Sequence, residues 1–123
     1  MLLSVEIISA KDFLKTSARG ELDLMKSKKL LGTIVEKARK YKDHHLMIDI
    51  RGTTSPHMGT IELYNIVIEM EKYKDILKNK IVVIDDDDEN FNKMEFIEMC
   101  AKNRGFKINV VTSYEEAVEW LMS

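Results

Sequence analysis

Three short apolar runs, separated by stretches of helical periodicity, constrain the fold of this 123-residue chain more than any other feature. The runs are HLMIDI (45–50), KIVVI (80–84) and KINVVT (107–112). Apolar, β-branched runs of this length are typical of strands that are buried in a sheet. Because helical stretches separate them, crossover connections have to join consecutive strands, which predicts a largely parallel sheet.

The intervening segments carry apolar residues at helical spacing. They predict helices over about 25–41, 61–77, 90–104 and 115–122. Asp23 precedes the first helix as a capping residue, and Ser113 opens the last helix with a capping box. Gly105 is placed to end the third helix in a left-handed conformation. On the last helix, Ala117 and Leu121 are expected to face the sheet beside Trp120.

Two further extended segments lie ahead of the first helix, at 2–8 and 13–22, the second with Gly20 near its end. The first is free to pair antiparallel at the sheet edge. The predicted order is β-β-α-β-α-β-α-β-α, an α/β fold with a mostly parallel five-stranded sheet, an antiparallel N-terminal edge strand and four helices. With no linker or repeat, residues 1–123 are predicted to form a single domain.

The charge balance and the single cysteine narrow the function classes. Lys and Arg total 19 against 21 Asp and Glu, giving a net charge of −2, which argues against a nucleic-acid binder. Cys100 alone cannot form an internal disulfide and suits a reducing compartment. No stretch of 18 apolar residues and no signal peptide is present. We therefore expect a cytoplasmic protein with no transmembrane segment and no cofactor.

Several segments together resemble a known family. They are GELDL (20–24), LMIDIRGTT (46–54), IVVIDDD (81–87), KINVVTS (107–113) and EEAVEWL (115–121). The chain resembles the STAS domain family, which comprises the anti-sigma-factor antagonists and the cytoplasmic domains of anion transporters. Its second half is most similar to the bacterial SpoIIAA-like (STAS/SEC14-type) group.

The resemblance implies a SpoIIAA-like fold and a non-enzymatic role as a regulatory or protein-interaction module. The group's similarity to CRAL-TRIO lipid carriers implies an alternative role, the transport of a small apolar or lipid ligand. The expected partner is therefore another protein or a small apolar molecule, and a homodimer is a further option. An interaction module needs an exposed patch, whereas a carrier needs an apolar cavity that opens to solvent.

One segment departs from the family pattern. Antagonists of the sporulation type carry Asp-Ser-x-Gly where a loop meets the second long helix, and that serine is phosphorylated. Here the segment is Ser55-Pro56-His57-Met58-Gly59. When Gly59 is matched to the family glycine, the acceptor position falls on His57 or Met58. Phosphorylation of the family kind is therefore not expected.

The segment 51–60 is the candidate binding loop. A glycine-containing turn that leads into a helix presents backbone N–H groups to an anion, and Arg51 and His57 would add charge. The resemblance places Asp23 on a neighbouring loop. The candidate binding residues are Asp23, Arg51, Thr53, Thr54, Ser55, His57 and Gly59. The alternative is that Pro56 and the glycines only shape a tight turn.

No nucleophile–base pair and no metal-ligand spacing emerges, so neither catalytic nor metal-binding residues are predicted. The acidic run 85–89 is similar to the magnesium pocket of response-regulator receivers, but no aspartate follows it to act as phosphate acceptor. Acidic residues at a helix start interact favourably with its dipole. We therefore expect no magnesium site of useful affinity there.

Overall fold

The computed structural model describes residues 4–86 and 88–123. Its elements alternate as the sequence predicts. They are β1 (Ser4–Ser9), β2 (Phe13–Glu21), α1 (Leu24–Ala38), β3 (His45–Thr54), α2 (Thr60–Glu71), β4 (Ile81–Ile84), α3 (Asp88–Asn103), β5 (Ile108–Val111) and α4 (Tyr114–Leu121). Residues 2 and 3 of the predicted first strand lie outside the described residues.

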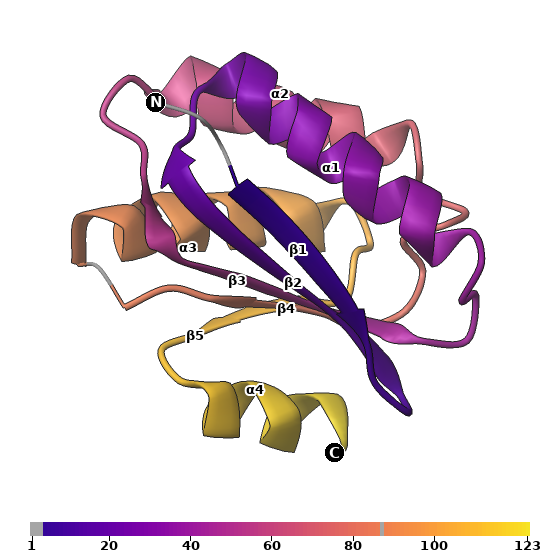
Figure 1. Cartoon of the computed structure of the whole chain (residues 1–123). Coiled ribbons are helices and arrows are strands. Elements are labelled where there is room, and N and C mark those ends of the chain that lie inside the picture. Colours follow the sequence, from indigo (N-terminus) through magenta and orange to yellow (C-terminus); the bar gives the residue numbers. More distant parts are fainter. Residues whose placement is uncertain (1–3, 87) are drawn as a thin grey trace.

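The strands form one sheet in the order β1-β2-β3-β4-β5, with β1 antiparallel to β2 and the other pairs parallel. This confirms the predicted α/β fold. Each crossover from β2 onward steps in the same direction, so right-handed connections place α1, α2 and α3 on one face of the sheet. The helix α4 follows the last strand and packs on the opposite face (Figure 1).

The two faces of the sheet have separate hydrophobic cores. The larger core lies under α1, α2 and α3 and reaches Val5 and Ile7 of β1. The smaller core lies under α4 and consists of Met47, Val82, Ile84, Val111, Ala117 and Leu121. Ala117 and Leu121 are 0% and 2% exposed, which confirms that they face the sheet. No helix in the described part of the chain is long and apolar enough to cross a membrane.

The helix α2 is shorter than the predicted 61–77. Its last bonds tighten to i→i−3 spacing: the N–H groups of Lys72 and Tyr73 donate to Glu69 and Met70 at 3.1 and 2.9 Å. The chain then continues in turns, and Leu77 is still buried. The apolar pattern therefore continues beyond the helix because the turn also packs against the core.

Side chains fix the end of the sheet at β5 and α4. The Nζ of Lys80 donates to the backbone oxygens of Trp120 (3.1 Å) and Ser123 (2.8 Å). At the sheet edge, the backbone N–H of Val110 in β5 donates to Oε2 of Glu98 at 2.7 Å. The predicted helix signals are also present: Ser113 Oγ accepts from the Glu116 N–H, and Gly105 has a φ of 91°.

Candidate functional site

The strand β3 is four residues longer than predicted, and this shortens the candidate loop. Thr53 and Thr54 pair with Gly20 and Glu21 of β2, and the N–H of Leu22 donates to the Thr54 carbonyl at 2.7 Å. Adjacent threonines favour a strand when a partner strand is available. The predicted loop 51–60 therefore reduces to residues 55–59, called the β3–α2 loop below.

A bulge in β3 separates the predicted binding residues onto two faces of the sheet. Ser17 pairs with Asp49, but the next pair is Arg19 with Gly52, so β3 carries one extra residue. Arg51 and Gly52 line a polar cleft on the face that carries α4. Thr53 instead lies inside the protein, only 5% exposed, and its Oγ1 donates to the Ile50 carbonyl at 2.7 Å.

Arg51 is fixed by Asp49 in a two-point ion pair. Its Nε and Nη2 donate to the two carboxylate oxygens at 3.0 and 2.8 Å. Burial alone would raise the pKa of Asp49, but the hydrogen bonds and charge of Arg51 outweigh it and lower that pKa. The same hydrogen bonds raise the pKa of Arg51. The cleft around this pair also includes Lys15, Arg19 and Asp86 and has a volume of about 450 Å³.

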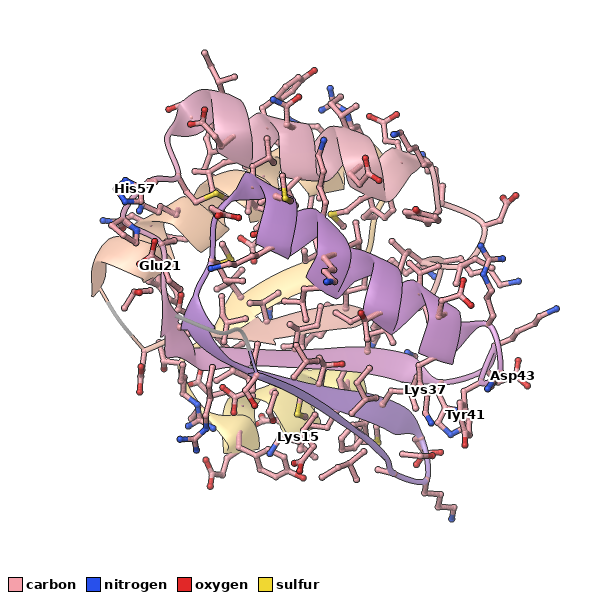
Figure 2. All side chains as sticks on the ribbon, turned by 45° about the horizontal axis from the view of Figure 1, so that its top comes forward. Lys15, Glu21, Lys37, Tyr41, Asp43 and His57 are labelled. Carbon is pink, nitrogen blue, oxygen red and sulfur yellow. The ribbon has the colours of Figure 1, made fainter. Side chains whose placement is uncertain are left out.

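One side of the β3–α2 loop is fixed against the protein, and the other side is exposed to solvent. Met58 is 5% exposed, and Lys93 of α3 donates to the carbonyl of Ser55. His57 points outward with its side chain 77% exposed, and its Nε2 lies 3.9 Å from Oε1 of Glu21 at the end of β2 (Figure 2). An ion pair forms there only when the imidazole is protonated. The anchors hold the outward part of the loop in one place.

Asp23 and Gly59 stand at the starts of α1 and α2. Asp23 Oδ1 accepts from the Lys26 N–H at 2.8 Å, which confirms its role as a helix cap. The Gly59 N–H donates to Oε1 of Glu62 at 2.8 Å, one half of a capping box. This N–H is therefore already bonded, and Glu62 brings a negative charge to the helix start, which disfavours an anion there.

The outer side of α2 is a surface that the sequence reasoning missed. Ile61, Tyr64 and Ile68 are 73%, 40% and 37% exposed and share one side of the helix, called the α2 outer face below. Other apolar residues, Leu63, Val67 and Met70, face the core. In the sequence, the spacing of apolar residues along α2 does not distinguish the exposed set from the buried set, and both belong to one broad apolar face. The sequence signal that could have revealed the exposed set is the number of apolar residues in the helix, which is larger than one core-facing stripe requires.

A partly open apolar cavity of about 110 Å³ lies between the sheet and the helices α1, α2 and α3. Apolar side chains line it, together with Ser27. A smaller space of about 30 Å³ adjoins it and shares Leu22, Ser27, Ile50, Ile66 and Met94 as lining residues.

The acidic run is only partly described. Asp85 is fully buried beside the smaller space, and Asp86 is exposed in the polar cleft. Asp87 and the side chains of Asp88 and Glu89 lie outside the described residues. Among the side chains that the structure does describe, no three His, Cys, Asp or Glu groups are placed to hold a metal ion. The prediction about magnesium stays a prediction.

Solved structures match the whole fold. An uncharacterized protein of the DUF3478 family with a SpoIIAA-like fold, from Shewanella loihica PV-4, is similar with a TM-score of 0.63 and 13% identity, over 97% of this chain and 93% of that one. An anti-sigma factor antagonist from Mycobacterium paratuberculosis is similar with a TM-score of 0.65 and 15% identity, over 99% and 96%. This protein has a SpoIIAA-like (STAS) fold. At 13% and 15% identity, the likeness establishes the fold of this chain.

No protein-family model and no curated protein matches this sequence. The β3–α2 loop brings Ser55, His57 and Gly59 together with the exposed Thr54. Arg51 lies on the other face of the sheet, and Asp23 caps the neighbouring helix.

Proposed function

We propose that this SpoIIAA-like protein is a non-enzymatic regulatory module that binds another protein through the β3–α2 loop and the α2 outer face. The observation that carries the proposal is the second apolar face of α2. A surface helix normally has one apolar stripe, which faces the core. Ile61, Tyr64 and Ile68 form a second stripe that begins directly after the loop, and contiguous exposed apolar residues mark interaction sites.

Tyr64 is suited to act as the anchor of such a surface. The guanidinium of Arg104 lies 4.9 Å from the centre of its ring and donates to its hydroxyl oxygen. The same guanidinium is bonded to Glu71. A ring that is already fixed loses little conformational freedom on binding, and tyrosine is enriched among residues that dominate binding energy.

Recognition in this proposal depends on shape and apolar contact and not on a phosphorylated serine. The position that the resemblance gives to the acceptor is taken by His57, which is exposed, or by Met58, which is buried. The similarity in fold to an anti-sigma factor antagonist supports a regulatory role.

The alternative role as a lipid carrier is less well supported. Ligand pockets in proteins are typically about 300–1,000 Å³. The apolar cavity here has about 110 Å³. That volume is too small for a lipid chain, so the cavity does not favour a lipid carrier.

Affinity capture from the native host tests the proposal with two matched variants. Ile61→Ser removes the most exposed isoleucine of the α2 outer face, and Ile8→Ser removes an isoleucine that is 52% exposed on β1. We expect the wild type and Ile8→Ser to capture the same protein, and Ile61→Ser to lose it. Circular dichroism checks that both variants are folded. Retention of every captured protein by Ile61→Ser would contradict the proposal.

A further inference from the structure

We propose that the polar cleft beside α4 binds a small zwitterion, a molecule that carries one carboxylate and one ammonium group. The cleft has a volume of about 450 Å³, within the range of about 300–1,000 Å³ that is typical of ligand sites. Lys15 borders it on the side of α4, with its Nζ 5.1 Å from the centre of the Tyr114 ring (Figure 2). The cleft and α2 lie on opposite faces of the sheet, so this inference does not rest on the proposed function.

The bulge in β3 brings two arginines together in the cleft. Neighbouring residues of a regular strand point to opposite faces, but a bulge sets two residues against one on the partner strand, and here Arg51 and Gly52 both border the cleft. Gly52 pairs with Arg19 of β2. A Cβ at position 52 would lie 2.9 Å from the Cγ of Arg19 and 3.2 Å from the Ala18 carbonyl oxygen. Glycine at this position therefore gives the stem of Arg19 room to lie against β3, beside Arg51.

Both guanidinium groups keep N–H donors for a ligand. Asp49 accepts from Nε and Nη2 of Arg51, which leaves Nη1 for other contacts. The side chain of Arg19 is exposed and forms no hydrogen bond or ion pair within the described part of the chain. Guanidinium groups match a carboxylate, because its two oxygens accept parallel N–H bonds. Since Asp49 already fixes Arg51, little conformational freedom of that arginine is lost on binding.

Asp86 gives the same cleft a negative group for the ammonium end of the ligand. It is exposed, and among the residues that the structure describes it forms no ion pair with Arg19 or Arg51. The hydrogen bond to Asp49 and, further down, the charge of Asp86 raise the pKa of Arg51, so Asp86 lies within electrostatic reach of that arginine. Opposite charges that share a cleft without pairing leave space for a ligand that contacts both.

The charge balance of the cleft favours a zwitterion over an anion such as phosphate. The positive side chains that line it are Lys15, Arg19 and Arg51, and the negative ones are Asp49 and Asp86. Glu115 of α4 adds a further negative charge near Arg51. A phosphate would be repelled by these carboxylates, whereas a zwitterion is neutral overall and places its positive group beside Asp86.

The test uses free glycine, β-alanine and γ-aminobutyrate, in which the two charges are progressively further apart. Each is compared with the carboxylate and the amine of the same chain length, such as butyrate and butylammonium for γ-aminobutyrate. Binding to the purified full chain is followed by ¹H–¹⁵N NMR titration. We expect at least one zwitterion to give saturable shifts at Arg19, Gly52 and Asp86, with a Kd of about 1 mM, and to bind at least tenfold more tightly than its matched carboxylate and amine.

Three pairs of variants locate the effect. Arg19→Gln should weaken binding at least tenfold, whereas Arg39→Gln, at an exposed arginine after α1, should not. Asp86→Asn should remove the preference for the zwitterion over its matched carboxylate, whereas Asp75→Asn, at an exposed aspartate after α2, should leave it unchanged.

The third pair keeps every charge and changes only the space beside Arg19. Gly52→Ala should weaken binding at least fivefold because the new Cβ displaces the stem of Arg19, whereas Gly32→Ala should not, since a Cβ there meets nothing within 4 Å. Thermal unfolding checks that each variant is folded.

Each outcome decides. Absence of saturable binding by all of the zwitterions, or equal binding by wild type and a folded Arg19→Gln, would overturn the site. Equal affinity for a zwitterion and its matched carboxylate would overturn the role of Asp86, and unchanged binding by a folded Gly52→Ala would overturn the role of the bulge. Because the purified chain is used alone, these results are independent of whether a protein partner is captured.

Discussion

The face of the sheet under α1, α2 and α3 carries apolar side chains from β1 across to β5, whereas the opposite face is covered only where α4 packs on it. Where both faces are covered, as in β4, every residue is buried. Where one face is open, as in β2, buried and partly exposed residues alternate. The half-covered sheet lets polar residues such as Asp49 and Arg51 occupy a strand without disturbing the larger core.

The largest expected effect tests whether α4 makes a real second core. Leu121→Ala should lower the free energy of unfolding by about 2–4 kcal/mol, because its side chain is 2% exposed between α4 and the sheet. Chemical denaturation measures the change. Met122→Ala, one residue later and 48% exposed, is the control and should have little effect. A loss below about 1 kcal/mol for Leu121→Ala would mean that α4 is not docked.

A smaller effect tests how α4 is held at its end. Lys80→Met should lower stability by about 1–2 kcal/mol, because it removes the hydrogen bonds from Nζ to Trp120 and Ser123. Lys78→Met, an exposed lysine two residues earlier, is the matched control. Equal stability of the two variants in urea denaturation would show that the Lys80 contacts contribute nothing.

The contribution of the Asp49–Arg51 ion pair, on the open face of the sheet, to the free energy of unfolding should depend on pH. The pKa of Asp49 is lowered from 3.8, so its ion pair with Arg51 stabilises the fold fully above that pH and is lost as the pH falls through the folded-state pKa. Arg51→Gln should therefore lower stability by about 0.5–1 kcal/mol at pH 7, and the difference from wild type should close as the pH falls below 3.8. Urea denaturation across this range measures it. A difference that does not depend on pH would exclude the ion pair as its cause.

The smallest effect concerns the exposed top of the β3–α2 loop. His57→Ala should change stability by less than about 0.5 kcal/mol, because the side chain is 77% exposed and its nearest carboxylate oxygen is 3.9 Å away. Differential scanning calorimetry checks this. A large loss would mean that the loop depends on His57 for its structure, and partner capture by this variant could then not be interpreted as recognition.

The fold could be predicted because apolar residues recur with a different period in its strands and in its helices. The buried runs at β4 and β5 and the caps at Asp23 and Ser113 are local signals, and all four are confirmed. The end of β3 could not be predicted, because the residues RGTT (51–54) are typical of a loop and form a strand only through their pairing with β2. Hydrogen bonds between distant segments decide such boundaries.

The candidate site was predicted only in part, for the same reason. Ser55, His57 and Gly59 do lie in one loop, but Arg51 lies beside Asp49 on the face that carries α4, and the bulge in β3 turns Thr53 into the interior. A bulge is a property of strand pairing and leaves no fixed mark in the sequence. The exposure of Ile61 and Ile68 likewise depends on where α1 and α3 stop covering α2.

The contact between Glu98 and Val110 has a consequence for self-association. A sheet edge is a template on which another chain can add a strand, and an open edge at both ends allows growth without limit. Here Glu98 occupies an N–H on β5, so an incoming strand would first have to displace a carboxylate. Addition is easier at β1, where two copies could join edge to edge about a twofold axis. Growth beyond such a pair would have to use the β5 edges, where Glu98 competes with an incoming strand.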